Sequence, residues 1–590
     1  MNEHRPIDRR LPYRIGSPWL PVLPVLTTDI DDIEAILPNK SQIAIGDILR
    51  RLSINASFAG FVHRHNRGQA TNRNTVTLLI VSELKTEQDI EKCETAVHRI
   101  CENAAQSRSN CAVEIIDCQA FPAHLPVFPI PETSQHLVAV WNSLLPQLQT
   151  LIESRQWVTI DGMLQRRPHS VPRPTAIISA KDANDSIWWD ELLPDIRELF
   201  LKNNWDFDVA LLHLDRSPLS GDEARGDRVD EPEIHEGWYE NPVGVGSSCG
   251  IAGSESSGTL GGRFVLTKDN IALEMGLTSA NVLLRGSTFD MTTGPFRPST
   301  SLSTVKVVSP SEQDHAREVK ARETLLDSAT NEAAMYTGGN DAVALGTHFQ
   351  SFVDKKNMYQ RRRDEANAAD CHLGSVYASS GQITTPNPQY EGALRDNWAL
   401  DWALVKMTPS KTIASHVRHV PSSARFQSFD KISKWYSISA DVSHNVRKFG
   451  RSTGWTTGRV NLLQSAMKLD GGDSVDWYSN EPPLLGEGST VDKVTFSKGG
   501  FGGQVVHCHS VVDTRDWKTH HRFLRPGDSG SLVLYDGNLD EDGVVAVVGL
   551  SVGENDASRA SYMTPIDLVI GHIEEVTGGT VTYPRKGGRI

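Results

Sequence analysis

Residues 525–531 read Arg-Pro-Gly-Asp-Ser-Gly-Ser and are followed at 532–535 by the apolar run Leu-Val-Leu-Tyr. A serine nucleophile needs a tight turn that exposes its hydroxyl and leaves nearby backbone amides free to stabilise an oxyanion; glycine permits the necessary backbone angles. Ser529 is therefore the candidate nucleophile, and the amides of Gly527 and Ser529 are the candidate oxyanion donors. We expect Asp528 to turn inward and fix the loop. A bare Gly-Asp-Ser-Gly also occurs in ordinary turns.

The segments that follow this turn have the order expected of a β-rich enzyme domain. VVAVVGLSVG at 544–553 predicts a strand, and the edge formed by Ser551, Val552 and Gly553 would pair with the backbone of an extended peptide. Thr-Pro-Ile at 564–566 then leads into a predicted helix over 567–576. A chance turn would not arrange these elements in this order.

Three upstream segments complete the pattern. The chain reads GTLGG at 258–262, GLTSANVLL at 276–284 and DNWALDWALV at 396–405. With the serine turn, they resemble the chymotrypsin-like (trypsin-like) serine peptidases over residues 245–578. That resemblance implies an all-β, double β-barrel domain with Ser529 as nucleophile and Asp401 as the aspartate that orients the histidine. The alternative for Asp401 is a carboxylate that caps a strand.

The position at which the resembled family carries its catalytic histidine is occupied here by Asn281. An asparagine amide has no useful basicity near neutral pH, so it cannot accept the serine proton. Loss of a triad member leaves roughly 10³–10⁴-fold catalysis over water, from the oxyanion hole and binding alone. We therefore expect impaired turnover. The segments 372–376, 379–381 and 449–454 are also similar to intracellular fungal relatives of this fold.

Four other histidines are candidates for a substitute base. His315 and His348 lie in a predicted helical insertion, which could fold back over the site, and His507 and His509 lie in VVHCHSVV. Residues i and i+2 on a strand share a face, a spacing that also permits a metal site. No third ligand is near them in sequence, so ordinary strand histidines are favoured. We expect neither a metal nor another cofactor.

Substrate preference rests on one position. In the resembled family the residue six before the nucleophile often lies at the base of the primary specificity pocket, and here that residue is Phe523. A bulky apolar side chain would not attract lysine or arginine. The resemblance therefore disfavours trypsin-type specificity.

Residues 1–215 predict an α/β region of two related modules. In the first, a strand at 75–81 precedes a helix from Thr86, whose spacing to Asp89 is that of an N-cap and its third-position carboxylate, and a strand follows at 112–116. The second repeats this order with a strand at 175–180, a helix, and a strand at 207–214. Neither module holds a phosphate-binding loop or a carboxylate pair, so no function can be assigned to them.

Composition changes mark the remaining boundaries. Residues 216–244 are acidic and loop-like and are interpreted as a linker. Residues 311–367 have a charged helical pattern that breaks at 337–340, which predicts a helical hairpin inserted into the β domain; a mobile loop is the alternative. Residues 579–590 form a tail.

Charge, hydropathy and cysteine content limit the class of protein. A formal charge of −14 argues against a nucleic acid as the main partner. No apolar run approaches the roughly 18 residues of a membrane span, and no signal peptide is recognisable, so we expect no membrane and a cytoplasmic location. The seven cysteines are odd in number and scattered, which favours free thiols in a reducing compartment.

The residues support three hypotheses. The first is a peptidase homologue with impaired catalysis that binds peptide or protein segments in its cleft. The second is an active serine endopeptidase that uses Ser529 and Asp401 with a base from elsewhere. The third is a scaffold or interaction protein whose β domain is only structural.

Overall fold

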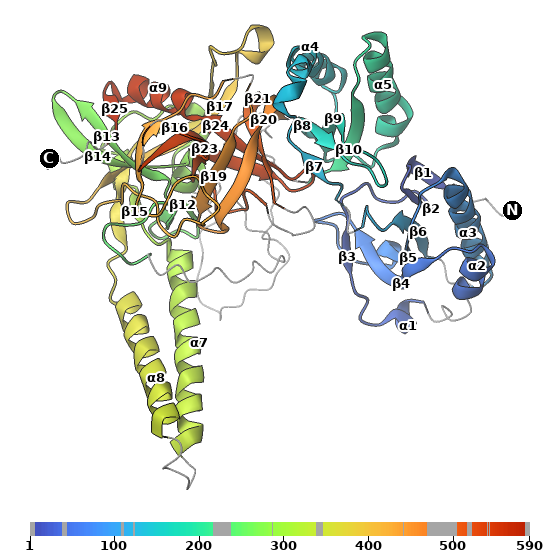
Figure 1. Ribbon diagram of the computed structural model, residues 1–590, viewed down its shortest axis with the longest axis horizontal. Helices are drawn as coiled ribbons and strands as arrows, with labels where there is room; N and C mark the ends of the chain where they lie inside the picture. The colour runs from blue at the N-terminus through green and yellow to red at the C-terminus, as the bar shows by residue number, and fades with distance from the viewer. Residues whose placement is uncertain are drawn as a thin grey trace.

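The computed structural model describes residues 6–37, 44–107, 111–121, 124–215, 238–285, 287–337, 346–439, 442–468, 504–515, 522–539, 541 and 543–583. Over these residues the protein is β-rich and multidomain, with fewer helices than strands (Figure 1). Among the described helices, none combines the length and the apolar character needed to cross a membrane. Residues 216–237 of the expected linker and 584–590 of the expected tail lie outside the described residues.

The first module is a six-stranded sheet with the order β1-β2-β6-β5-β4-β3. Its strands are β1 (Asp8–Leu11), β2 (Arg14–Ser17), β3 (Leu26–Thr28), β4 (Ala56–His65), β5 (Val76–Ser82) and β6 (Ala112–Asp117), and its helices are α1 (Ile33–Ile36), α2 (Ile45–Arg51) and α3 (Glu87–Gln106). The predicted cap of α3 is confirmed, because Thr86 Oγ1 accepts from the Asp89 amide at 3.2 Å and the Asp89 carboxylate accepts from the Thr86 amide at 3.0 Å.

The second module repeats the element order of the first. It consists of α4 (His136–Leu151), β8 (Trp157–Gln165), β9 (Arg173–Ala180), a π-helical turn at Trp188–Leu192, α5 (Leu193–Lys202) and β10 (Asp208–His213). In both modules a helix precedes an antiparallel strand pair, and a second helix leads to a parallel third strand. Strands β4, β5 and β6 thus correspond in pairing to β8, β9 and β10.

The second module is joined to the β-strands that follow it. Strand β8 pairs with β20 (Gly454–Lys468) through Ile160 opposite Ala466 and Thr159 opposite Met467. One buried apolar cluster contains Trp141 and Trp188 from the module together with Trp398 and Leu463 from the later strands. The division into residues 1–215 and 245–578 did not predict this shared sheet and core.

In the carboxy-terminal part, the strands form two sets of pairings, and the second set closes on itself. The first set contains β11 (Ser248–Ile251), β12 (Gly258–Thr259), β13 (Gly262–Lys268), β14 (Ile271–Thr278), β15 (Lys306–Val308), β16 (His372–Thr385) and β17 (Trp398–Met407). Its pairings run β13-β14-β17-β16-β15-β11-β12, and β12 continues into β13.

The second set contains β19 (Asn445–Gly450), β20, β21 (Val505–Asp513), β22 (Leu532–Tyr535), β23 (Val544–Asn555) and β24 (Ala560–Pro565). Its pairings run β19-β20-β21-β24-β23-β22-β19. Two further strands border these sets, namely β18 (Lys431–Trp435) on β23 and β25 (Thr580–Thr582) on β13, and β7 (Val127–Phe128) pairs with β8 of the second module.

Four α-helices lie in the described residues of this part of the chain. The short helix α6 (Ala280–Leu284) follows β14, and α9 (Ile566–Thr577) follows β24 and buries Ile566, Val569 and Ile573 against the strands. Between β15 and β16 the chain forms α7 (Glu312–Thr337) and α8 (Gly346–Asn367), which lie side by side and project away from the strands (Figure 1). The predicted break begins at the end of α7, and residues 338–345 lie outside the described residues.

Candidate active site

The turn that carries Ser529 has the backbone geometry expected of it. Gly527 and Gly530 have φ angles of +93° and +89°, in the left-handed region that side chains disfavour. A Cβ atom at Gly530 would also collide with Thr278 Oγ1 and approach the Ser279 amide. The turn therefore packs directly onto the end of β14, and Ser529 itself is partly exposed.

Asp528 turns inward, as predicted, and its partner is a buried lysine. Lys448 Nζ donates to Asp528 Oδ2 at 2.5 Å, and both side chains are fully buried. The other carboxylate oxygen accepts from the Ser452 amide at 2.9 Å. Burial lowers the pKa of Lys448, and the negative charge of Asp528 opposes that shift. This charged pair fixes the turn to β19.

Asp401 lies inside β17, opposite Gln382 of β16, and therefore does not cap a strand. Its Oδ2 accepts from Ser279 Oγ at 2.5 Å, and its Oδ1 accepts from the Asn281 backbone amide at 2.8 Å. The backbone amide of Ala280 also donates to this carboxylate. Burial raises the pKa of Asp401 to about 6, although these hydrogen bonds favour the ionised form.

Asn281 lies in α6, directly after β14, and is buried. Its backbone amide donates to Asp401. Gly530 packs against Thr278 and Ser279, which lie between the end of β14 and the start of α6. The fold thus brings together the three segments that the sequence singled out around Asn281, Asp401 and Ser529, although they are far apart in the chain.

The amides of the serine turn alternate in their hydrogen bonding. Asp528 N donates to Arg525 O at 2.9 Å, and Gly530 N donates to Ser551 O at 3.0 Å. Within the described part of the chain, neither Gly527 N nor Ser529 N donates to an acceptor. These are the two amides that the sequence assigned as oxyanion donors.

The predicted substrate-binding edge follows the same turn. Ser551 is tied to it, because its amide donates to Ser531 O at 3.0 Å while its carbonyl accepts from Gly530. Beyond Ser551, β23 pairs with β24 through Gly553 opposite Tyr562, and over the described residues its other edge has no paired strand. Val552 is fully buried.

Phe523 is also buried, in an apolar cluster with Val446, Val533 and Met563, and its carbonyl accepts from Thr456 Oγ1 at 2.8 Å. Its side chain thus contributes to the core of the second strand set. Its role in selecting substrates stays a prediction.

The alternative histidines have other partners. His315 Nδ1 lies 3.0 Å from Tyr239 Oη, at the start of α7. His507 Nδ1 lies 3.1 Å from Asp396 O, and the His509 ring packs on Trp398 with a centroid distance of 5.1 Å. Burial lowers the pKa of His509 to about 4. His348 belongs to α8, and its side chain lies outside the described residues. Among the described residues, no group of three histidine, cysteine or acidic side chains could hold a metal ion.

Sequence reasoning missed two side chains that shape the site. Lys448 could have been found from the alternation in NVRKFG, which places it on the same inward face as Val446. Ser279 could not, because its bond to Asp401 spans 122 residues and serine is common in turns.

Neither a protein-family model nor a curated protein matches this chain. A search of solved structures finds a chain described as "A glutamic acid specific serine protease utilizes a novel histidine triad in substrate binding". It is 12% identical, and the match covers 58% of this chain and 100% of that one, with a TM-score of 0.24. A similarity this low carries no argument about fold or activity.

Proposed function

We propose that residues 245–578 form a trypsin-like serine-peptidase homologue with two β-barrels, and that it binds peptide or protein segments with impaired turnover. The closed second set of strand pairings, and the first set whose two end strands β12 and β13 are consecutive in the chain, support the two-barrel architecture. The observation that carries the proposal is the meeting of three segments. Asp401 accepts a hydrogen bond from the backbone amide of Asn281. Gly530 packs against Thr278 and Ser279.

Impaired turnover follows from the chemistry of the side chains. Ser529 supplies a hydroxyl and its turn supplies two amides, but acylation also requires a base to take the hydroxyl proton. Asn281 cannot act as that base. The described histidines His315, His507 and His509 contact Tyr239, Asp396 and Trp398, and none of these contacts is with the serine turn.

Peptide binding is proposed at the edge of β23 beyond Ser551, which has no paired strand among the described residues. A strand with one edge paired and the other open can accept an extended peptide through main-chain hydrogen bonds. Residues after Ser551 offer such an edge beside the serine turn. Binding of this kind does not depend on a base at position 281.

A fluorophosphonate probe and labelled casein peptides test the proposal together. We expect little or no labelling of Ser529 in the parent protein, but measurable peptide binding by fluorescence anisotropy. Ser529→Trp places a bulky ring at the partly exposed turn and should abolish that binding. Ser328→Trp, at an exposed position of α7, is the matched control and should leave binding unchanged.

Strong labelling that disappears in Ser529→Ala would favour the active endopeptidase with another base. Absence of both labelling and peptide binding would favour the scaffold. Either result would overturn the proposed function.

A further inference from the structure

The helical insertion is attached to the strands by a buried ion pair. Asp314, in the first turn of α7, and Arg451, directly after β19, are almost fully buried. Arg451 Nη2 donates to Asp314 Oδ1 at 2.7 Å, and Arg451 Nε donates to Asp314 Oδ2. Such a bidentate contact between a guanidinium and a carboxylate fixes the relative orientation of the two groups as well as their distance.

Asp314 is also surrounded by hydroxyl groups. Ser257 Oγ donates to Asp314 Oδ2 at 3.1 Å, and Ser248 Oγ also donates to Oδ2. Ser311 Oγ accepts from the Asp314 amide at 3.3 Å and so caps α7. Burial alone would raise the pKa of Asp314, but Arg451 and the hydroxyls hold it below its usual value. The carboxylate is therefore a charged, fully bonded group.

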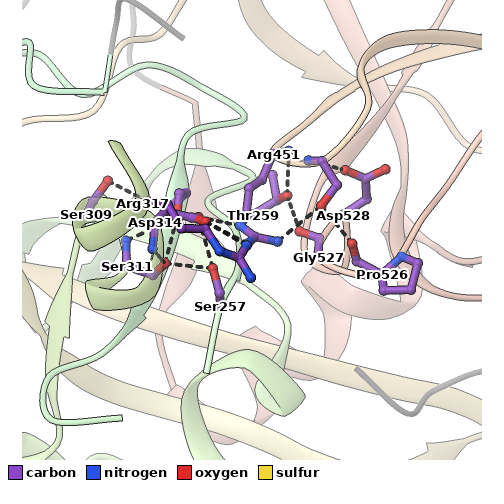
Figure 2. Close-up of polar contacts among 12 residues, drawn as sticks. Ser257, Thr259, Ser309, Ser311, Asp314, Arg317, Arg451, Pro526, Gly527 and Asp528 are labelled. Atoms are coloured by element: carbon purple, nitrogen blue, oxygen red, sulfur yellow. Dashed lines mark hydrogen bonds and ion pairs between the residues drawn. The ribbon is translucent and has the colours of Figure 1, made fainter. Parts of the chain in front are cut away.

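Arg451 contacts the serine turn on its other side. A Cβ atom at Gly527 would collide with Arg451 Nη1, so the guanidinium lies directly against that glycine. The Arg451 amide donates to Thr259 Oγ1 at 3.0 Å, and Thr259 Oγ1 donates to Gly527 O at 2.9 Å. Figure 2 shows Arg451 between the Asp314 cluster and the turn of Gly527 and Asp528.

The same threonine reaches the candidate nucleophile. Thr259 N donates to Ser529 O at 3.0 Å. A continuous series of contacts therefore links α7, through Asp314, Arg451 and Thr259, to the serine turn. Its end points are Gly527 and Ser529, whose amides are the candidate oxyanion donors. A buried ion pair adds little stability relative to apolar packing, but removal of one partner is costly, so such pairs are suited to specifying one conformation.

We propose that the helical insertion is a structural part of the site, in which Asp314 acts through Arg451 to position the turn of Gly527 and Ser529. Both are positioning residues, since neither would touch a substrate. The functional meaning of this arrangement rests on the proposed function, but the positioning itself can be measured without any reaction.

Amide hydrogen exchange of the full-length protein measures that positioning. The amides of Asp528, Gly530 and Ser531 have backbone acceptors and report on opening of the turn. In Asp314→Asn and in Arg451→Lys, we expect their exchange to accelerate by about tenfold or more. Arg451→Lys keeps the positive charge, so it remains informative if Asp314→Asn fails to fold.

Two controls separate this effect from a general loss of stability. Glu114→Gln disturbs another buried carboxylate, which pairs with Arg64 at 2.8 Å in the first module. Arg317→Gln removes an exposed arginine that approaches the same Asp314 at 3.7 Å. Neither should change exchange in the serine turn.

The same substitutions in an Asn281→His background add a chemical measurement. We expect the maximal rate of fluorophosphonate labelling to fall by about tenfold in Asp314→Asn and Arg451→Lys. If Asn281→His shows no labelling at all, the peptidase-like roles proposed for Ser529 and Asp401 fail, and the exchange data still decide the positioning. Unchanged exchange in a folded Arg451→Lys protein, or equal acceleration in Glu114→Gln, would overturn the inference.

Discussion

On the proposed function, replacement of Asn281 by histidine should supply the missing base between Asp401 and Ser529. Asp401 accepts from the residue 281 amide at 2.8 Å through one oxygen and from Ser279 Oγ at 2.5 Å through the other. Each carboxylate oxygen has two lone pairs, so the oxygen bound by Ser279 can also accept from an imidazole Nδ1–H.

The structure also limits the size of the gain. Asn281 is buried, and a larger ring in a packed site typically costs about 1–3 kcal/mol in strain. The pKa of Asp401, raised by burial from 3.8 to about 6, corresponds to about 3 kcal/mol against the ionised form that must stabilise an imidazolium. We therefore expect at least about tenfold over the parent, out of the several orders of magnitude that a triad supplies.

The assay is labelling of Ser529 by a fluorophosphonate, together with hydrolysis of a peptide or ester substrate. Both should increase as the pH rises through about 6, because Asp401 ionises over that range. Asn281→His combined with Ser529→Ala is the control and should abolish labelling. A parent protein as reactive as the variant, or an experimental structure with the Asn281 side chain far from Ser529, would refute the reasoning.

Four further predictions concern stability and covalent state. Lys448→Met should lower the free energy of unfolding in urea by about 3–5 kcal/mol because it leaves a buried carboxylate unpaired, whereas Lys85→Met, in an exposed pair, should lower it far less; equal losses would contradict this. The folded-state pKa of Asp401 exceeds its unfolded value, so the contribution of Asp401 to stability falls as the pH rises from 3.8 to about 6. Asp401→Asn should therefore stabilise the protein by up to about 3 kcal/mol at pH 8 and hardly at pH 3.5. A change in stability that does not depend on pH would argue against this prediction. All seven thiols should react in denaturant without reductant, and Cys249, whose pKa burial raises to about 12, should resist modification in the native state; two or more disulfides would overturn this. Limited proteolysis should cut first within 216–244, and the fragments should elute together because β8 pairs with β20; early cleavage within 400–560 would count against the architecture.

Sequence reasoning succeeded where the deciding interaction is local. The positive φ angles of Gly527 and Gly530 are requirements of the turn itself, and only glycine meets them without strain. The cap of α3 lies within four residues, between Thr86 and Asp89. The helices of the insertion follow from long charged segments rich in residues of high helix propensity. Such features can be predicted because all the residues that interact lie within a few positions of one another in the sequence.

Features that depend on distant partners could not be predicted. The Lys448–Asp528 pair spans 80 residues and the Arg451–Asp314 pair spans 137. A charged side chain in a sequence is by default exposed, and only the fold shows that burial has removed water and left one charged partner. The pairing of β8 with β20 is similar, since an edge strand does not specify its partner.

The sequence by itself therefore determined the serine turn, the order of Asn281, Asp401 and Ser529, and the absence of a base at position 281. The tertiary structure decided that these segments meet, that Lys448 and Arg451 hold the serine turn, and that the second amino-terminal module shares a sheet with the later strands. The physical reason is that residue chemistry is a property of each position. Burial and long-range pairing are properties of the whole chain, fixed only when distant segments exclude water together.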